Sequence, residues 1–537
     1  MSLNLNFSEC SSCKNLLKFI FVIFMMVSNV QSDNVLKSLP SQKASTLHAF
    51  QWSGMGAKLL DPRIMFWQKG SSPQIDKTKF LPDNWQYTYG GTTSKNLYST
   101  DTGSILIQTP STPGVYTAYY CYTNTKSELE CSVSVVIAVI NCKTEKITTS
   151  SIEHIIILIS ENHSFDSIYG GYCKAPTGSK PTCNYGEYCC ESAPQNVSGS
   201  SPFVLTDAQN ALYDPCHSRE CEVSEINGGK MDKFVIGGNG SNKYNFAVSA
   251  DTADSAQSYF NYARNGAMAD NFFQSVTGSS YSNNMYFAGG KFFFTDNTVA
   301  PQSKDINGAK CYNVEFQTLH DPTIADLLNT CNVTWTVYAE GYDVYPTDKQ
   351  CWPEYFNAAD IPFLYFNSLT QSQTASYNFR DLNKLEDDLN NGTLPSVSYI
   401  KGLGIHSEHP GHKNCFTSGQ QLANSIINLV INSQYQKNTV IFLVPDESGG
   451  FYDHITPPDS STIDGVQYGP RTQFIAIGQQ TKNNYISHVQ MEPTSLIKFI
   501  EWNWLDGTGQ LETRDTVVNN IGDLLDSALT GVEIPIN

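Results

Sequence analysis

Two uninterrupted apolar runs constrain the fold of this chain of 537 residues more than any other feature. One covers residues 154–160 (His-Ile-Ile-Ile-Leu-Ile-Ser) and the other covers residues 439–445 (Thr-Val-Ile-Phe-Leu-Val-Pro). Because neither run alternates with polar residues, both predict strands that are buried on two faces, as in a parallel sheet covered by helices. Residues 324–328 and 422–431 have the pattern of such helices. The sequence therefore predicts an α/β domain, a layered α/β/α sandwich with a mostly parallel central sheet.

Oxygen-rich side chains follow both runs directly. Glu161 and Asn162 come after the first run, and Asp446 and Glu447 come after the second. Since ligands of such sheets bind just beyond the carboxyl ends of the strands, we expect these four side chains to meet at one edge. Their oxygens suit a hard divalent metal ion, which would also neutralise the crowded carboxylates. The alternative is that these residues only end strands and cap helices. That explanation is common for a single polar pair, but it is less convincing when two such pairs follow two strands.

The N-terminal region has a different pattern. Residues 33–145 are rich in Thr, Ser, Tyr and Val, and strand-like runs at 104–108, 115–122 and 131–140 lie between turn signals. Tyr119 stands two residues before Cys121, as in the tyrosine corner of immunoglobulin-like domains. We expect an N-terminal immunoglobulin-like β-sandwich over residues 33–145, followed by one large domain over residues 147–537. The sandwich is expected to be a packing or spacer module, because a fold alone does not specify a function.

The first 32 residues are typical of a signal peptide. Lys14 and Lys18 precede an apolar run at 19–27, and a plausible cleavage site ends at Ser32. No later run of about 18 apolar residues predicts a transmembrane anchor in the mature protein. We therefore expect a secreted protein, or one held in a lysosomal or vesicular lumen.

The cysteines and glycosylation sequons agree with that route. Of the 15 cysteines, Cys10 and Cys13 would leave with the leader, and the odd remainder predicts one unpaired thiol among disulfides. The sandwich contains Cys121, Cys131 and Cys142. We expect two of them to form one local disulfide and the third to pair elsewhere. Sequons lie at Asn196, Asn239, Asn332 and Asn391. A further sequon at Asn162 is expected to carry no glycan, because that side chain should face the metal.

The charge of the chain excludes one class of partner. Lys and Arg number 33 and Asp and Glu number 51, so the formal net charge is −18. Such a chain repels a nucleic-acid backbone at long range, and we expect no nucleic-acid partner. If the substrate itself carries a phosphate, a metal ion or local cations must reverse the field at the site.

Several catalytic motifs do not occur in the sequence. It has no Gly-x-Ser-x-Gly elbow, no Walker-type phosphate loop and no His-Glu-x-x-His helix. A nucleophilic hydroxyl could come from residues 269–284, which hold several Ser and Thr side chains. Spacing alone does not choose among them, since a Ser at a helix start is usually an N-cap.

Five sequence blocks occur in a fixed order along the second domain. They are Glu161-Asn162-x-Ser-Phe-Asp, Ala269-Asp270-Asn271-x-Phe, Pro-Ser-Val-Ser-Tyr-Ile at 395–400, His409-Pro410, and Asp446-Glu447-x-Gly-Gly-Phe-Tyr-Asp-His-x-x-Pro-Pro. Together they resemble the phosphoesterase family of the alkaline-phosphatase superfamily. That family joins phosphatidylcholine-type phospholipases C, plant non-specific phospholipases C and certain acid phosphatases. The resemblance runs from residue 153 to the C-terminus and does not include the sandwich.

The resemblance implies a role for each matching residue. The metal ligands would be Glu161, Asn162, Asp446 and Glu447, and the nucleophile, which would also touch the metal, would be Ser280. Ser279 and Ser282 are the neighbouring alternatives. The catalytic histidines would be His217, His409 and His454. His406 and His412 flank His409 but do not match the family, so they are expected to be solvated loop residues.

The activity implied by the resemblance is hydrolysis of phosphate ester bonds through a phosphoseryl intermediate. The cofactor would be a divalent metal ion of unknown identity, and the substrate a phosphate ester that in one branch is a phospholipid. The two branches are not separated, because Ser279-Ser280 is closer to the acid phosphatases whereas Asp446-Glu447 is closer to the phospholipases C. The alternative from another class is a cell-surface or carbohydrate-binding protein with a vestigial catalytic domain.

Overall fold

The computed structural model describes most of the C-terminal region and the strands of the N-terminal region. The described residues are 35–37, 41–43, 47–53, 60–68, 85–87, 102–108, 113–123, 129–145, 148–293, 319–343, 355–370, 372–413 and 415–537. They belong to two compact units. The first unit draws on Met1–Ser38, Ser45–Pro110 and Tyr116–Val135, and the second on Leu39–Ala44, Ser111–Val115 and Val136–Asn537. The leader expected at residues 1–32 lies outside the described residues, and the domain boundary expected at 145–147 stays a prediction.

The N-terminal region consists of β-strands where it is described. One antiparallel sheet has the order β1-β3-β6, and a second sheet has the order β2-β8-β7-β4-β5. The predicted strand runs at 104–108, 115–122 and 131–140 lie within β6, β7 and β8. The strands are β1 (Val35–Lys37), β2 (Ser41–Lys43), β3 (Leu47–Ser53), β4 (Leu60–Gln68), β5 (Trp85–Tyr87), β6 (Thr102–Gln108), β7 (Gly114–Thr123) and β8 (Leu129–Ile140). Strands are thus confirmed, and the immunoglobulin-like arrangement stays a prediction.

An eight-stranded sheet forms the centre of the second unit, in the order β14-β13-β15-β9-β16-β17-β12-β18. Strand β17 is antiparallel to both of its neighbours, and the other pairings are parallel. The strands are β9 (His154–Ser160), β12 (Ala267–Ala269), β13 (Trp335–Ala339), β14 (Phe379–Asp381), β15 (Val397–Lys401), β16 (Thr439–Pro445), β17 (Ile475–Gly478) and β18 (Tyr485–Ser487). The two apolar runs of the sequence are β9 and β16. A mixed α/β fold with a large, mostly parallel sheet is therefore confirmed.

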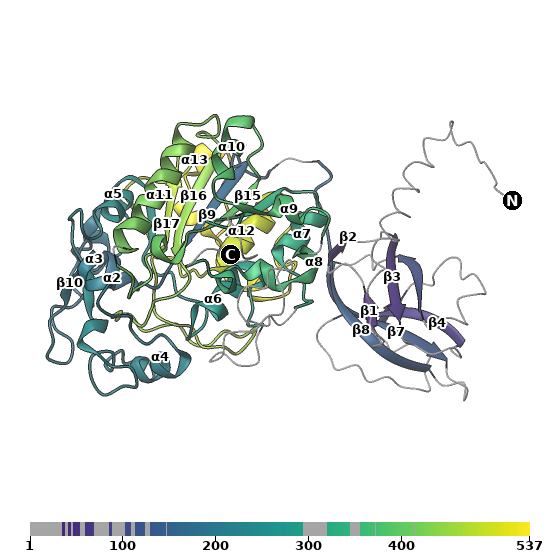
Figure 1. Ribbon diagram of the computed structural model, residues 1–537, viewed down its shortest axis with the longest axis horizontal. Coiled ribbons are helices and arrows are strands. Elements are labelled where there is room, and N and C mark those ends of the chain that lie inside the picture. Colours follow the sequence, from purple (N-terminus) through teal and green to yellow (C-terminus); the bar gives the residue numbers. More distant parts are fainter. Residues whose placement is uncertain are drawn as a thin grey trace, which may run out of the picture. The chain divides into compact units, whose positions relative to one another are not determined.

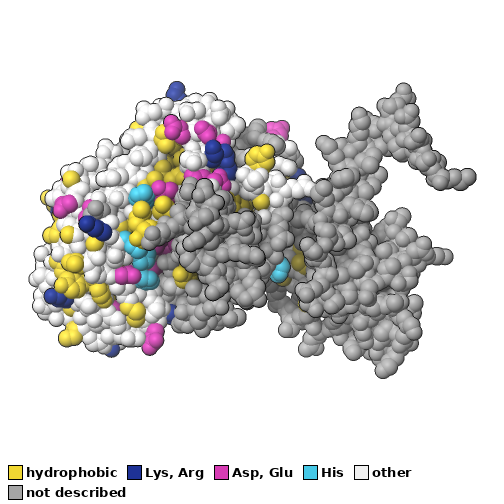
Figure 2. Space-filling model, viewed as in Figure 1, with side chains coloured by type: hydrophobic (Ala, Val, Ile, Leu, Met, Phe, Trp, Pro, Cys, Tyr) yellow, Lys and Arg dark blue, Asp and Glu magenta, His cyan; other side chains and the backbone are white. Residues whose placement is uncertain are grey.

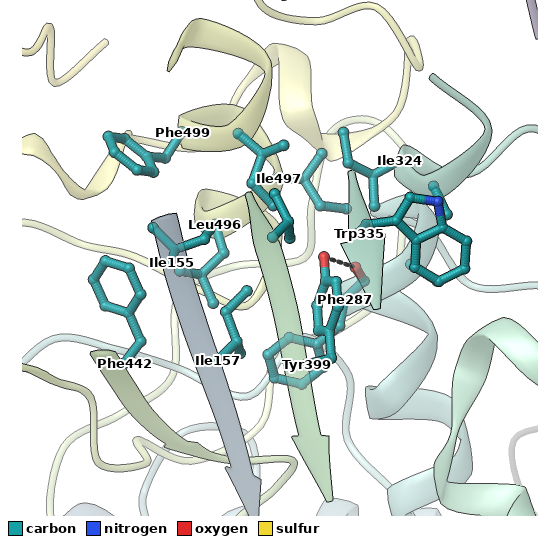
Figure 3. Packing of buried hydrophobic residues seen from close by; sticks show 14 of the residues in the cluster. Ile155, Ile157, Phe287, Ile324, Trp335, Tyr399, Phe442, Leu496, Ile497 and Phe499 are labelled. Carbon is teal, nitrogen blue, oxygen red and sulfur yellow. Dashed lines mark hydrogen bonds between the residues drawn. The ribbon is translucent and has the colours of Figure 1, made fainter. Parts of the chain in front are cut away.

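Side chains of these strands pack on both faces of the sheet. Ile155 and Ile157 of β9 belong to one hydrophobic cluster, and Ile156 and Leu158 belong to a second one on the opposite face. Figure 3 shows the first cluster, to which helices α6 (Ser280–Gly289), α7 (Ile324–Thr330) and α12 (Thr494–Trp504) contribute Phe287, Ile324 and Leu496. Helices α5, α10 and α11 contribute to the second cluster. Because helices cover both faces (Figure 1), the strands need no polar side, which explains their continuous apolar composition.

The helices of the second unit vary widely in length. Those expected at 324–328 and 422–431 are α7 and the C-terminal part of α11. The α-helices are α2 (Phe165–Tyr169), α3 (Asp207–Asn210), α4 (Arg219–Ile226), α5 (Gln257–Asn265), α6 (Ser280–Gly289), α7 (Ile324–Thr330), α8 (Asn367–Thr370), α9 (Ala375–Asn378), α10 (Lys384–Asn391), α11 (Cys415–Ile431), α12 (Thr494–Trp504) and α13 (Ser527–Thr530). Two short strands, β10 (Phe203–Leu205) and β11 (Ala247–Ser249), form a separate parallel pair. The 3-10 helices are η2 (Glu187–Cys189), η3 (Lys243–Asn245), η4 (Ala358–Asp360), η5 (Pro362–Tyr365), η6 (Gly404–His406), η7 (Arg514–Thr516) and η8 (Ile521–Leu524).

Disulfides cross-link the described part of the second unit. Cys142 pairs with Cys331, so one of the three cysteines of the N-terminal region pairs outside it, as expected. The local disulfide expected among these cysteines would fall to Cys121 and Cys131, which lie outside the described side chains. The other described disulfides are Cys173–Cys190, Cys183–Cys189 and Cys216–Cys221. Among the described residues the free thiol is that of Cys415, which is buried.

The sequons and helices also bear on the route of the protein through the cell. Asn196, Asn239, Asn332 and Asn391 are all exposed, whereas Asn162 is completely buried. Exposure at these four positions and burial at Asn162 are what the sequence led us to expect. Within the described ranges, every helix is too short or too polar to cross a membrane.

Candidate active site

The side chains that follow β9 and β16 meet at one edge of the sheet, as expected. The two strands are neighbours, with Ser160 opposite Pro445, and the backbone N–H of Asp446 donates to the carbonyl of Ser160 at 3.2 Å. All four predicted metal ligands lie just beyond this point and are buried: Glu161, Asn162, Asp446 and Glu447. The parallel register therefore places four oxygen-bearing side chains together.

Glycines let the two loops approach each other closely. Gly449 has a φ of 67°, and a Cβ added there would lie 2.2 Å from the carbonyl oxygen of Asn162. Gly450 has a φ of 70°, and a Cβ there would lie 2.5 Å from the carbonyl oxygen of Cys216. A side chain at Gly449 would collide with the loop after β9, and one at Gly450 would collide with the segment around Cys216, which explains the two glycines. Asn162 itself has a left-handed backbone with a φ of 56°, a conformation that asparagine tolerates better than most residues.

Ser280 is the serine that the fold brings to these side chains. It is the first residue of α6, and its Oγ lies 3.4 Å from Oδ1 of Asn162 and 3.5 Å from Oε1 of Glu447. Ser279 is the N-cap of α6, but its side chain makes no capping hydrogen bond. The usual role of a serine at a helix start is therefore not the role of either residue.

The loop before α6 is held by the side chain of Asn283. Its Oδ1 accepts from the N–H of Val276 at 3.1 Å, and its Nδ2 donates to the carbonyls of Val276 and Gly278 at 3.0 and 2.9 Å. Because one buried amide satisfies several backbone groups of the loop, the position of Ser280 is fixed before any substrate binds.

Lys401 lies at the centre of the carboxylates, although we did not predict it. It is the last residue of β15, it is buried, and its Nζ lies 2.6 Å from Oε1 of Glu161 and 4.0 Å from Oδ2 of Asp446. Burial alone would raise the pKa of Glu161, yet Lys401 and His409 lower it to about 2. The ammonium thus keeps Glu161 ionised. The available signal was a lysine directly after the sequence block at 395–400.

Replacing Lys401 by methionine is expected to lower the free energy of unfolding by about 3–5 kcal/mol, because loss of one partner of a buried ion pair leaves the other charge uncompensated. Urea denaturation in the presence of EDTA measures this change. Lys498→Met is the matched control, because Lys498 is buried to the same degree, 6% exposed like Lys401, but donates to the carbonyl of Val518 at 2.7 Å. Equal losses in the two variants would contradict the role of the ion pair.

Asp360 is a second residue at this centre that the sequence did not reveal. It ends η4 and is buried beside Glu161 and Lys401. Burial raises the pKa of Asp360 well above its usual value, and the charge of Glu161 raises it further. Burial and the charge of Glu161 therefore both favour the protonated form of Asp360. No local pattern marks it, because it lies in a loop remote in sequence from both apolar runs.

Asp446 and Glu447 are oriented by their own hydrogen bonds. Oδ2 of Asp446 accepts from Nδ2 of Asn284 at 3.0 Å, and Oε2 of Glu447 accepts from the N–H of Gly449 at 2.5 Å. Burial raises the pKa of Asp446 to about 6 and that of Glu447 well above its usual value. A cation bound at this position would stabilise the ionised forms of both buried acids.

His217 and His409 lie next to each other beside Glu161. Their ring centroids are 5.9 Å apart, and Nε2 of His409 lies 3.8 Å from Oε2 of Glu161. The Nδ1 atoms contact backbone carbonyls, of Pro215 at 2.9 Å and of Pro410 at 2.7 Å, which leaves each Nε2 available to a ligand. Figure 2 shows histidine side chains gathered on one face of this unit, with acidic and hydrophobic side chains around them.

These two histidines also form a candidate metal site with Asp214. One ligand atom from each of Asp214, His217 and His409 lies within 4.8 Å of the others. The pKa of His217 is lowered by burial, whereas the pKa of His409 is raised because Glu161 and Asp214 outweigh its burial. Burial therefore favours the neutral form of His217, whereas the neighbouring carboxylates favour the protonated form of His409.

His454, the third predicted histidine, has a different environment. Its Nδ1 lies 2.8 Å from Oδ2 of Asp166 and its Nε2 lies 3.0 Å from Oε2 of Glu191. Arg471 completes this buried cluster with ion pairs to Asp166 at 3.1 Å and Asp453 at 2.9 Å. Burial alone would lower the pKa of His454, but Asp166 raises it to about 9. Both ring nitrogens of His454 are therefore engaged by carboxylates.

His406 and His412 both keep part of their surface exposed, as expected of loop residues, but each ring also has a partner. Nδ1 of His406 lies 2.8 Å from Oε1 of Glu340. His412 is half-buried, with its ring 5.5 Å from that of His409 and 5.6 Å from that of Tyr355. Glu340 and Tyr355, which contact these two rings, come from distant segments of the chain, so no pattern within the loop reveals them.

The spacing of the oxygens around Ser280 fits a divalent cation. When two oxygens each bind the same ion at about 2.4 Å with an oxygen–ion–oxygen angle of about 90°, they lie about 3.4 Å from each other. The Oγ of Ser280 has nearly this distance to Oδ1 of Asn162 and Oε1 of Glu447, 3.4 and 3.5 Å. With Asp446 and Glu161 adjacent in sequence to those residues, the donor set is all oxygen, as a hard cation requires.

Comparisons with known proteins give a family match over the same region. Residues 152–505 match the phosphoesterase family. The non-hemolytic phospholipase C of Burkholderia pseudomallei is 23% identical over 407 residues, which cover 67% of this chain and 56% of that protein. The chain thus spans about half the length of the curated relatives that it matches over most of its own length.

Matches from other branches are shorter or more distant. The acid phosphatase of Aspergillus niger is 29% identical over 135 residues, which cover 24% of this chain and 31% of that protein. Among solved structures, a protein in the alkaline phosphatase superfamily from Vibrio parahaemolyticus matches with a TM-score of 0.34 and 9% identity. That match covers 72% of this chain and 74% of the other chain.

Proposed function

Because the chain belongs to the phosphoesterase family, we propose that it hydrolyses phosphate esters with Ser280 as the nucleophile. The observation that carries this proposal is the position of the Ser280 hydroxyl. It lies at the start of α6, within 3.5 Å of the side-chain oxygens of Asn162 and Glu447. The complete set of ligand-type side chains around it argues against a vestigial catalytic domain.

The residues that would hold a divalent metal ion are Glu161, Asn162, Ser280, Asp446 and Glu447. When bound, such an ion lowers the pKa of a coordinated hydroxyl and neutralises charge on the phosphate oxygens. Lys401 supplies part of the same neutralisation, because its ammonium lies between Glu161 and Asp446. These positive groups together explain how a chain with a net charge of −18 can accept an anionic substrate.

The chemical step would proceed through a covalent intermediate. The Oγ of Ser280 attacks phosphorus, the bond from phosphorus to the ester oxygen breaks, and a phosphoserine remains. A water molecule then cleaves that phosphoserine and restores the hydroxyl. His217 and His409 would hydrogen-bond phosphate oxygens and protonate the leaving alkoxide. His454 would act indirectly, since its two nitrogens tie Asp166 to Glu191.

Two substrate classes are compatible with the relatives, whose names are phospholipase C and acid phosphatase. Turnover of p-nitrophenyl phosphate, p-nitrophenylphosphorylcholine and phosphatidylcholine vesicles across pH 4–8 separates them. Preference for the first indicates a phosphomonoesterase, and preference for the other two indicates a phospholipase C.

Metal dependence is tested with the same substrates. We expect purified protein to contain a stoichiometric divalent metal by mass spectrometry, and EDTA to abolish turnover until the metal is restored. Protein that holds no metal and hydrolyses none of the three esters would instead favour the cell-surface or carbohydrate-binding alternative.

The proposed site of action is outside the cell or in a vesicular lumen. Four disulfides among the described residues and four exposed sequons are the observations that support it. Disulfides of this kind persist in oxidising compartments, where glycans are also added.

A further inference from the structure

A buried acid on α4 contacts both loops of the proposed active site. Glu222 has no exposed surface, and its Oε2 accepts from the N–H of Gly278 at 2.7 Å and from Nε2 of Gln274 at 2.8 Å. Its Oε1 is hydrogen-bonded to Oγ of Ser448 at 3.2 Å. Gly278 lies two residues before Ser280, and Ser448 directly follows Glu447. One carboxyl group therefore bridges the loop of the nucleophile and the loop of a predicted metal ligand.

Gln274 closes this bridge into a network. Its Oε1 accepts from the N–H of Ser448 at 2.7 Å, and its Nε2 also donates to the carbonyl of Val276 at 2.9 Å. Gly278 has a φ of 128°, a backbone conformation that residues with a side chain rarely adopt. The loop thus depends on a defined geometry at the point where Glu222 binds it.

Helix α4 is itself anchored next to the histidine pair. It begins directly after His217 and Ser218, and the disulfide Cys216–Cys221 joins its first turn to the segment that carries His217. One turn before Glu222, Nη1 of Arg219 donates to Oγ1 of Thr277 at 3.2 Å. The same short helix therefore contacts the nucleophile loop twice and adjoins a proposed catalytic histidine.

We propose that Glu222 is a positioning residue that sets the distance between Ser280 and Glu447. The inference rests on the proposed function and identifies how its central contact is maintained. Loss of the carboxyl group would leave the Gly278 N–H and the Ser448 hydroxyl without their partner and would release both loops. Because nucleophile and ligand must stay within a fraction of an ångström of their working positions, catalysis should fall before substrate binding does.

The chemical state of Glu222 determines which substitution should preserve its role. Burial raises the pKa of Glu222 to about 8, so the group is a neutral acid at neutral pH. Glutamine has the same charge as that acid, and it offers one oxygen to Gly278 and Gln274 and an amide donor to Ser448. Alanine offers neither.

Glu225 gives a matched control on the same helix. It is equally buried, but its Oε1 accepts from Nδ2 of Asn245 at 2.9 Å, away from both loops. Burial raises its pKa to about 10. Glu225→Ala therefore removes a buried carboxyl from α4 without breaking the bridge.

The test compares Glu222→Ala, Glu222→Gln and Glu225→Ala in the full chain. Steady-state kinetics with p-nitrophenyl phosphate or p-nitrophenylphosphorylcholine, whichever the wild type hydrolyses faster, is paired with thermal melting. We expect Glu222→Ala to lower kcat by about 30–100-fold with KM within about threefold, since small displacements of reacting groups cost about this much. Glu222→Gln and Glu225→Ala should keep kcat within about threefold, although Glu225→Ala lowers the melting temperature.

The outcomes separate this inference from the proposed function. A wild type that hydrolyses no phosphate ester would refute the proposed function itself. An active wild type together with a Glu222→Ala variant of normal kcat, or with equal kcat losses in Glu222→Ala and Glu225→Ala, would overturn the positioning role alone. If Glu222→Ala does not fold, Glu222→Met, which fills the same volume without a hydrogen bond, serves in its place.

Discussion

Replacing Ser280 by alanine is expected to lower the hydrolysis of an activated phosphate ester by at least about 10³-fold, because the variant lacks the hydroxyl proposed to form the covalent intermediate. The change removes one oxygen that lies 3.4 Å from Asn162 and 3.5 Å from Glu447. These contacts are long for hydrogen bonds, so the loss should have little effect on stability. Initial rates and thermal melting of the same preparation measure both quantities.

Ser279→Ala and Ser282→Ala are the controls for the choice of serine. Both residues neighbour Ser280 and were alternatives on sequence grounds. Neither is expected to lower the rate more than about threefold, because the hydroxyl that contacts Asn162 and Glu447 stays in place. A normal rate in Ser280→Ala, or a loss of activity in Ser282→Ala instead, would assign the nucleophile to another residue.

Replacing Asp446 by asparagine should lower both metal content and activity by at least about 100-fold, since the variant keeps the shape of the side chain but removes its charge. In the wild type, Oδ2 of Asp446 accepts from Asn284 at 3.0 Å and Oδ1 accepts from the N–H of Glu447 at 2.9 Å. Metal content is measured by mass spectrometry of the purified variant, and activity with excess metal added.

Asp381→Asn is the matched control for this substitution. Asp381 is also a buried aspartate at the carboxyl end of a parallel strand, β14 at the edge of the same sheet. Its carboxylate accepts from the N–H groups of Asp343 and Asn383 at 3.2 and 3.1 Å. Normal metal content in Asp446→Asn, or an equal loss in Asp381→Asn, would contradict the assignment of Asp446 as a ligand.

The first and last residues of the two apolar strands could be predicted from the sequence. The runs at 154–160 and 439–445 are β9 and β16 with the same bounds. The reason is that a strand covered on both faces must be apolar at every position, so its composition alone identifies it. The polar residues that follow such strands must then lie at the edge where ligands bind, which is why Glu161, Asn162, Asp446 and Glu447 were found together.

The environment of the histidines was predictable only in part. His217 and His409 lie side by side, although they are far apart in sequence. His454 follows the same loop as Asp446 and Glu447, yet its ring binds Asp166 and Glu191. Local sequence specifies that a histidine is present, but the charges that face it come from other segments, and those charges decide its protonation and its partners.

The residues that neutralise and orient the site were not predictable from local patterns. Lys401 contacts Glu161 because β15 pairs with β9, and Asp360 reaches the same cluster from a loop between other strands. Glu222 joins Gly278 to Ser448 from a helix that carries no recognisable motif. Each of these contacts depends on which segments become neighbours, and that order is set by the packing of the whole sheet.

By itself, the sequence determined the class of fold, the two central strands and the oxygen-rich residues beyond them, because burial and strand ends impose strict composition on short segments. Only the tertiary structure decided that Ser280 is the serine next to Asn162 and Glu447, that Lys401 neutralises Glu161, and that His454 binds carboxylates on both nitrogens. The physical reason is the sequence separation over which each effect acts. Local composition reflects how deeply a segment is buried, whereas pairing and charge depend on contacts between segments that are distant in the chain.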